Sequence, residues 1–169
     1  MNYTKKIVFS GLCAAIGIVL PQAFHAIPNA GSIFLPMHIP TLFCGLVCGP
    51  LFGCLCGGVS CLLSHLIFGM PPAMILPGML IELMVYGLVA GIMANILKNK
   101  NIGAIYVELI VAMLCGRVVA GILNALIFRA GAYSMQVWIA GSFVTALPGI
   151  IIQLVLIPVL VSRLKHLIN

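Results

Sequence analysis

The chain has 169 residues, of which 63% are hydrophobic and 6% are charged, and its mean hydropathy is +1.29. Soluble globular domains carry about 25% charged residues, so this composition excludes a soluble fold. Six membrane-spanning helices of about 20 residues each would use most of a chain of this length and leave only short connections. We therefore expect one all-α, membrane-embedded domain over residues 1–169.

Six apolar segments follow one another along the chain, and each predicts a helix that crosses the membrane. They cover residues 7–24, 36–49, 51–68, 77–97, 102–128 and 137–161. The second segment is the shortest, about 21 Å long as a helix. Its ends therefore need shielding by neighbouring helices.

The basic residues outside these segments predict the topology. They form three pairs, which are Lys5 with Lys6, Lys98 with Lys100, and Arg163 with Lys165. Because an even number of spans returns the chain to its starting side, all three pairs fall on one side of the membrane. Lys and Arg accumulate in short cytoplasmic loops. We therefore predict that both termini are cytoplasmic, and we attribute the net charge of +6 to topology rather than to a nucleic-acid surface.

The remaining charged residues lie inside apolar segments or at their edges, and they are Glu82, Glu108, Arg117 and Arg129. A charged side chain costs about 2.5–3.5 kcal/mol at the centre of a bilayer, so such residues mark candidate functional sites. Counted along the helices, Glu82 and Arg117 fall in the outer half of the membrane. Glu108 and Gln153 lie nearer the cytoplasm.

Helical spacing groups the polar residues of the outer half into stripes. Tyr86 shares a face with Glu82, Asn124 shares one with Arg117, and Trp138 shares one with Thr145. Between these stripes we predict an outward-facing pocket for a small polar molecule with an anionic or strongly accepting group. The candidate ligand-binding residues are His38, Glu82, Tyr86, Arg117, Asn124, Trp138 and Thr145.

Two structural alternatives stay open for these residues. Glu82 and Arg117 can form a buried ion pair that only fixes helix packing. His38, like His65, can be a hydrogen-bonded structural residue that never touches a ligand.

The first segment carries small residues at helical spacing. Gly11 and Ala15 are four residues apart and Ala14 lies beside them, so another helix can approach this surface closely. The surface serves either a partner protein or internal packing.

The sequence offers little for catalysis or for metal binding. It contains no Asp, which excludes a Ser-His-Asp triad, and it has no P-loop or dinucleotide-binding glycine motif. The seven cysteines lie in apolar segments, where a thiol behaves as a small hydrophobic group. We expect no catalytic residue and no metal site. An intramembrane hydrolase that uses Ser60 or Ser64 with His65 is the rival hypothesis.

Several motifs, taken in chain order, resemble a known family. They are SIFLPMHIP at residues 32–40, the Gly49-Pro50 turn, FGMPP at residues 68–72, ELMVYG at residues 82–87, and Gly116-Arg117. This arrangement resembles the substrate-binding S component of energy-coupling factor (ECF) vitamin transporters.

The resemblance implies a multi-pass plasma-membrane subunit of an ECF-type ABC importer that is not an enzyme and has no cofactor of its own. The implied partners are a transmembrane T component, docked on Gly11, Ala14 and Ala15, and two cytosolic ATPases that hydrolyse ATP. The implied ligand is a water-soluble vitamin or related micronutrient. Pantothenate is the first candidate, followed by folate, pyridoxine, riboflavin and a deazapurine. A stand-alone secondary carrier is the alternative.

Overall fold

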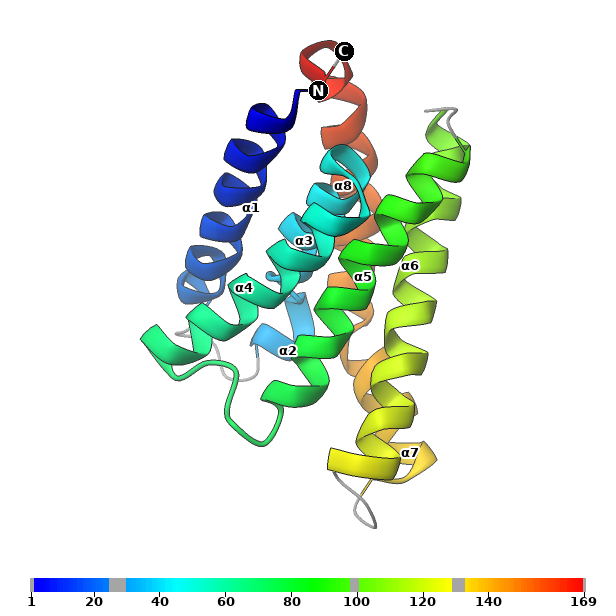
Figure 1. Ribbon diagram of the computed structural model, residues 1–169. Helices are drawn as coiled ribbons and strands as arrows, with labels where there is room; N and C mark the ends of the chain where they lie inside the picture. The colour runs from blue at the N-terminus through cyan, green and yellow to red at the C-terminus, as the bar shows by residue number, and fades with distance from the viewer. Residues whose placement is uncertain (1, 25–29, 98–100, 129–132, 169) are drawn as a thin grey trace.

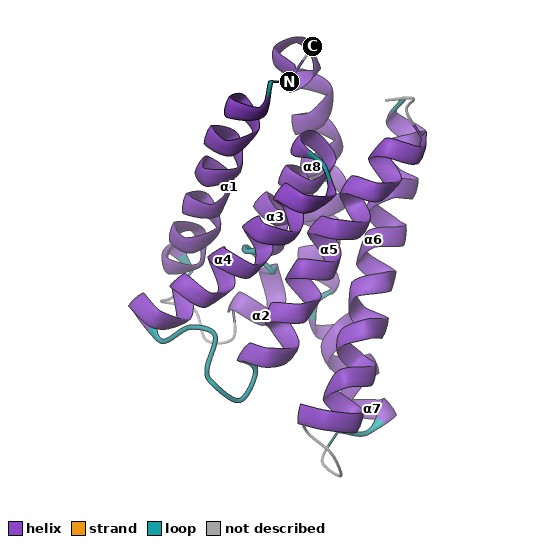
Figure 2. Ribbon diagram, viewed as in Figure 1, coloured by secondary structure: helices purple, strands orange, loops and turns teal. Residues whose placement is uncertain are grey.

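The structure is a computed structural model that describes residues 2–24, 30–97, 101–128 and 133–168, and these residues are almost entirely helical, with no strand among them (Figures 1 and 2). The helices are α1 Tyr3–Ala23, α2 Ala30–Phe34, α3 His38–Cys48, α4 Pro50–Phe68, α5 Leu76–Leu97, α6 Ile102–Leu123, α7 Met135–Ile139 and α8 Leu147–Ile168, with π-helical turns η1 Asn124–Phe128 and η2 Ala140–Thr145. Within these described residues, six stretches are long and apolar enough to cross a membrane. The predicted all-α membrane fold is confirmed.

Proline accounts for two breaks in the helices, one at the start of the expected segment 36–49 and one within the expected segment 137–161. Pro36 separates α2 from α3, because the residue before a proline avoids the helical conformation; Leu35 has a φ of 50°. Pro148 lies in the first turn of α8, where its missing N–H is tolerated, and it cannot continue the preceding helix. The last apolar segment is therefore α7, η2 and α8 in succession.

The shortest span lies at the centre of the molecule. Helix α3 contacts α1, α4, α5 and α8, and all of its residues except Ile39 are buried. Of the span that contains it, 72% is buried, against 17–39% for the five other spans. The neighbouring helices thus provide the shielding that so short a segment needs.

Glycine backbones bring α3, α4 and α5 into direct contact. A Cβ atom added to Gly53 would lie 2.5 Å from the carbonyl oxygen of Gly87 and 2.6 Å from the Cα of Gly45. One turn further along α4, a Cβ atom at Gly57 would lie 2.6 Å from the carbonyl oxygen of Leu83. Only residues without a side chain fit here, so this contact fixes α5, and the polar residues it carries, against α3 and α4.

Both termini lie at the same end of the molecule, which is also the end where α5 finishes and α6 begins (Figure 1). Lys5 and Lys6 start the chain at that end, and Arg163 lies near its finish. Lys98 and Lys100 lie outside the described residues. The cytoplasmic orientation of this end stays a prediction from the basic residues.

Candidate functional site

Four of the predicted ligand-binding residues meet between α3, α5 and α6, and we call them the charged cluster: His38, Glu82, Tyr86 and Arg117. The Glu82 Oε1 atom lies 3.7 Å from His38 Nε2 and 3.8 Å from Arg117 Nε. The Tyr86 ring meets the His38 ring edge-on, with 5.1 Å between the ring centroids. A cation, a carboxylate, an imidazole and a phenol are thus within reach of one ligand.

Local sequence explains how these side chains come together. His38 is the first residue of α3, and its backbone N–H donates to the carbonyl of Leu35, 3.1 Å away, at the break caused by Pro36. Glu82 and Tyr86 are one helical turn apart on α5. Gly116, beside Arg117 on α6, leaves room for the Tyr86 ring, which a side chain at that position would meet.

The charged cluster is buried, yet its polar atoms are not saturated. His38 is 2% exposed, Arg117 3% and Tyr86 0%, whereas the Glu82 side chain is 23% exposed. Within the described structure, both His38 ring nitrogens, the Tyr86 hydroxyl and two Arg117 nitrogens have no hydrogen-bond partner. A buried polar group without a partner costs about 1–3 kcal/mol. The cluster therefore has unused hydrogen-bonding capacity within the described structure.

Aromatic rings cover the other side of the arginine. The Arg117 Cζ atom lies 5.4 Å from the centroid of the Phe143 ring, a cation–π distance. The Trp138 ring meets the Phe143 ring edge-on at 5.4 Å, and Trp138 Nε1 donates a hydrogen bond to the Arg117 carbonyl oxygen at 3.2 Å. Trp138 and Phe143 thus form an aromatic wall beside the cluster.

The π-helical turn η2 explains why Phe143 was not among the predicted residues. A π-helix repeats at i→i+5, and Trp138 and Phe143 are five residues apart. The α-helical spacing used for the prediction instead grouped Trp138 with Thr145, which is exposed in the structure. A ligand contact by Thr145 stays a prediction, and no period of 3.6 residues could have identified Phe143.

Asn124 lies at the start of η1 and connects α6 with α5. Its Nδ2 atom donates to the carbonyl of Ala120 at 2.8 Å. Its side chain also packs on Gly78 of α5, where an added Cβ would lie 2.7 Å from the Asn124 Oδ1 atom. A ligand contact by Asn124 stays a prediction.

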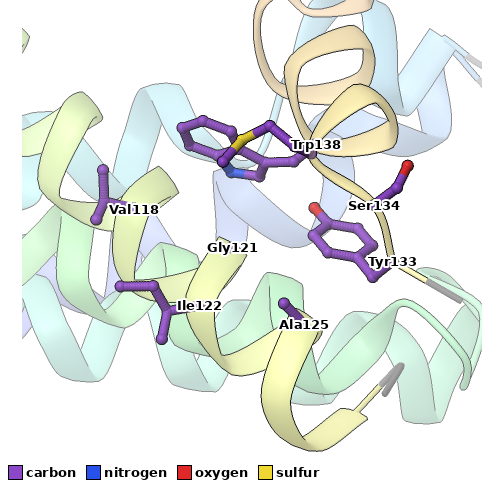
Figure 3. A pocket seen from close by; sticks show the side chains of 8 residues that line it. Val118, Gly121, Ile122, Ala125, Tyr133, Ser134 and Trp138 are labelled. Atoms are coloured by element: carbon purple, nitrogen blue, oxygen red, sulfur yellow. The ribbon is translucent and has the colours of Figure 1, made fainter. Parts of the chain in front are cut away.

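A pocket of about 270 Å³ opens between α6 and the segment that leads into α7 (Figure 3). In Figure 3 the Trp138 ring lies across from the α6 side chains, with the Tyr133 ring near Ala125. The lining residues are Val118, Gly121, Ile122, Ala125, Tyr133, Ser134, Met135 and Trp138. This pocket is mostly apolar, and its lining includes no residue of the charged cluster. Of the predicted ligand-binding residues, this cavity contacts only Trp138. The outward-facing polar pocket between the stripes therefore stays a prediction.

The structure gives the hydrolase hypothesis no Ser–His hydrogen bond among the described residues. The Ser60 hydroxyl donates to the Cys56 carbonyl at 2.6 Å. His65 Nδ1 lies 2.7 Å from the Pro71 carbonyl oxygen, so the ring holds the loop after α4. The described residues also contain no group of three or more potential metal ligands, and the cysteines are free thiols.

The small residues of α1 divide between two faces. Gly11 and Ala15 are exposed, and a Cβ at Gly11 would meet nothing within 4 Å. Ala14 instead packs against the core, and its carbonyl accepts a hydrogen bond from Ser60 at 3.4 Å. Gly17 lies on the same inner side, where an added Cβ would be 3.0 Å from the Ser60 hydroxyl oxygen. Docking on Gly11, Ala14 and Ala15 stays a prediction; Gly11 and Ala15 are exposed, whereas Ala14 is partly buried.

Comparison with known protein families identifies the family to which this chain is similar. The family model of the ECF transporter substrate-specific component matches residues 5–161, and this range runs through all six membrane-capable stretches. Searches of curated proteins and of solved structures each found no significant match. Arg129 lies within the matched range but outside the described residues. The resemblance inferred from the motifs is confirmed: the chain belongs to the substrate-specific components of ECF transporters and is an integral plasma-membrane protein.

Proposed function

We propose that this chain captures a small water-soluble vitamin or related micronutrient from outside the cell and delivers it inward with ATP-driven partner subunits. The observation that supports this most directly is the charged cluster, in which buried donors of His38, Tyr86 and Arg117 have no partner within the described structure. Such an arrangement gains its missing hydrogen bonds when a polar ligand enters.

The spacing of Glu82 and Arg117 favours a binding role over a purely structural ion pair. A hydrogen-bonded Arg–carboxylate pair has an N···O distance of about 2.7–2.9 Å, but the Glu82 Oε1 to Arg117 Nε distance is 3.8 Å. Neither partner is saturated by the other. Arg117 therefore keeps donors free for an anionic or strongly accepting ligand group, while Glu82 and His38 can hold a donor on the same ligand.

This chemistry ranks the candidate ligands. Pantothenate comes first, because it combines a carboxylate for Arg117 with hydroxyl and amide groups for Glu82, His38 and Tyr86. Folate, pyridoxine, riboflavin and a deazapurine follow. The aromatic wall of Trp138 and Phe143 lies beside Arg117 and suits ligands with a flat ring.

We expect the purified chain to bind one of these compounds tightly and without ATP. Mass spectrometry of the small molecules that co-purify with the detergent-solubilised protein identifies the ligand, and a titration with each of the five candidates checks it. Trp138 is the single tryptophan of the chain, so its fluorescence reports on the site. A protein that retains no small molecule and responds to none of the candidates would contradict the proposal.

The proposed partners are a transmembrane T component and two cytosolic ATPases, and the chain itself holds no cofactor. Family membership supports this assembly. Uptake should therefore require co-expression of the partner subunits. Uptake by this chain alone, at the same rate without the ATPases, would instead support a stand-alone carrier.

A matched pair of substitutions on α1 tests the proposed docking surface. Gly11→Leu should leave folding and ligand binding unchanged and lower uptake, because Gly11 is exposed and an added side chain meets no neighbour. Gly17→Leu should instead destabilise the protein, because Gly17 is buried against Ser60 and Pro40. Thermal stability, ligand affinity and uptake are measured for both variants. Normal uptake by Gly11→Leu would remove Gly11 from the docking surface.

A further inference from the structure

The apolar pocket between α6 and α7 is lined on one side by a membrane-capable span. Its α6 residues lie within the span Ile102–Phe128. Val118 is 44% exposed and Ile122 51%, so these two lining residues belong to the exposed apolar face of the span. In a bilayer, a cavity in such a surface is next to hydrocarbon chains rather than water.

The size and lining of the pocket fit a hydrocarbon chain. An engineered apolar cavity of about 150 Å³ holds a benzene molecule, and by the same proportion a cavity of this size holds about ten carbon atoms. The pocket has a volume of about 270 Å³ and no charged side chain in its lining. A water-soluble vitamin would lose its hydrogen bonds to water here and regain few of them. An acyl chain makes no hydrogen bonds to water, so it has none to lose on entering the pocket.

We propose that this pocket binds a segment of one phospholipid acyl chain. The chain lies along Val118, Ile122 and Ala125 and ends against the Trp138 ring. The Ser134 hydroxyl lies at the same pocket, where the polar end of a membrane lipid has a partner.

A bound chain would also support the charged cluster, since Trp138 belongs to both sites. The Trp138 ring packs on Gly121, where a side chain would collide with the indole. Its other contacts are the hydrogen bond to the Arg117 carbonyl and the edge-on contact with Phe143. Hydrocarbon in the pocket packs against the side of the Trp138 ring that lines the cavity. This packing keeps Trp138 and Phe143 in place beside Arg117.

The single tryptophan makes the lipid site directly measurable. The protein is placed in lipid nanodiscs that contain increasing fractions of phosphatidylcholine with brominated acyl chains, because bromine quenches tryptophan fluorescence on contact. The reference is the double variant Trp138→Phe with Leu66→Trp, whose tryptophan lies on the open surface of α4, where Leu66 is 75% exposed. We expect quenching of Trp138 to report an affinity of the pocket for the brominated lipid that is about threefold or more above the affinity at the reference tryptophan.

A pocket-filling substitution separates a specific site from ordinary lipid contact. Ala125→Leu should reduce quenching of Trp138 to the reference level, whereas Ala23→Leu, the same change at an exposed position on α1, should not. Val118→Phe fills the pocket from another wall and replaces Ala125→Leu if that variant does not fold. Quenching of Trp138 no stronger than the reference would overturn the proposal. Strong quenching that survives both pocket-filling variants would overturn it equally.

Discussion

Replacing Gly53 by alanine is expected to destabilise the folded protein by more than about 2 kcal/mol. The added Cβ would lie 2.5 Å from the Gly87 carbonyl oxygen and 2.6 Å from the Gly45 Cα. Both neighbours are backbone atoms of other helices, so relief requires α3 or α5 to move as a whole. Because α5 carries Glu82 and Tyr86, such a movement also separates the charged cluster and lowers ligand affinity.

Gly58→Ala, on the same helix, is the matched control. The nearest atoms to an added Cβ at Gly58 belong to the flexible Met84 side chain, at 3.4 Å and beyond. We expect this change to be neutral or slightly stabilising, since alanine favours a helix over glycine by up to about 1 kcal/mol in water. Thermal unfolding of both variants in the same detergent gives the comparison. Equal stability of Gly53→Ala and Gly58→Ala would contradict direct packing of the three helices.

Replacing Arg117 by glutamine should weaken ligand binding by about tenfold to a hundredfold, which corresponds to the loss of one hydrogen bond to a charged group. Arg117 is 3% exposed and has two nitrogens without a partner in the described structure. A ligand anion is the partner we propose for them. Titration of the purified variant with the co-purified ligand measures the effect, and a thermal melt confirms that the variant is folded.

The companion variant Glu82→Gln distinguishes a ligand contact from a helix-packing contact. If Glu82 only pairs with Arg117, removing the carboxylate leaves the affinity for an anionic ligand unchanged or higher, because a competing anion is gone. If Glu82 accepts a hydrogen bond from the ligand, the affinity falls. Unchanged affinity in a folded Arg117→Gln protein would remove Arg117 from the site in either case.

The membrane fold and the centre of the candidate site could be predicted from the sequence for simple physical reasons. Long apolar stretches have few alternatives to membrane helices. Charged residues inside them are costly, so residues at similar depth were expected to meet, and the structure brings His38, Glu82 and Arg117 together. Neither inference depends on side-chain detail.

What the sequence did not reveal depends on departures from regular α-helix and on packing. The spacing of Trp138 and Phe143 follows a π-helical turn, which moves Phe143 toward Arg117 and leaves Thr145 exposed. On α1, adjacent small residues point to different sides, so that Ala14 packs inside while Ala15 is exposed. Helical spacing groups residues on one side of a helix. It does not show which residues of the group pack against the protein and which stay exposed.

The enclosed position of α3 has a consequence for how far a ligand must travel. From His38 to Cys48 the helix has 11 residues, which at about 1.5 Å per residue is roughly half of a hydrocarbon layer of about 30 Å. The turn between α3 and α4 lies toward the end of the molecule that holds both termini (Figure 1). In the proposed function, a ligand bound at His38 would therefore lie about midway through the hydrocarbon layer. The proposed partner subunits would then need to open only the remaining half of the path.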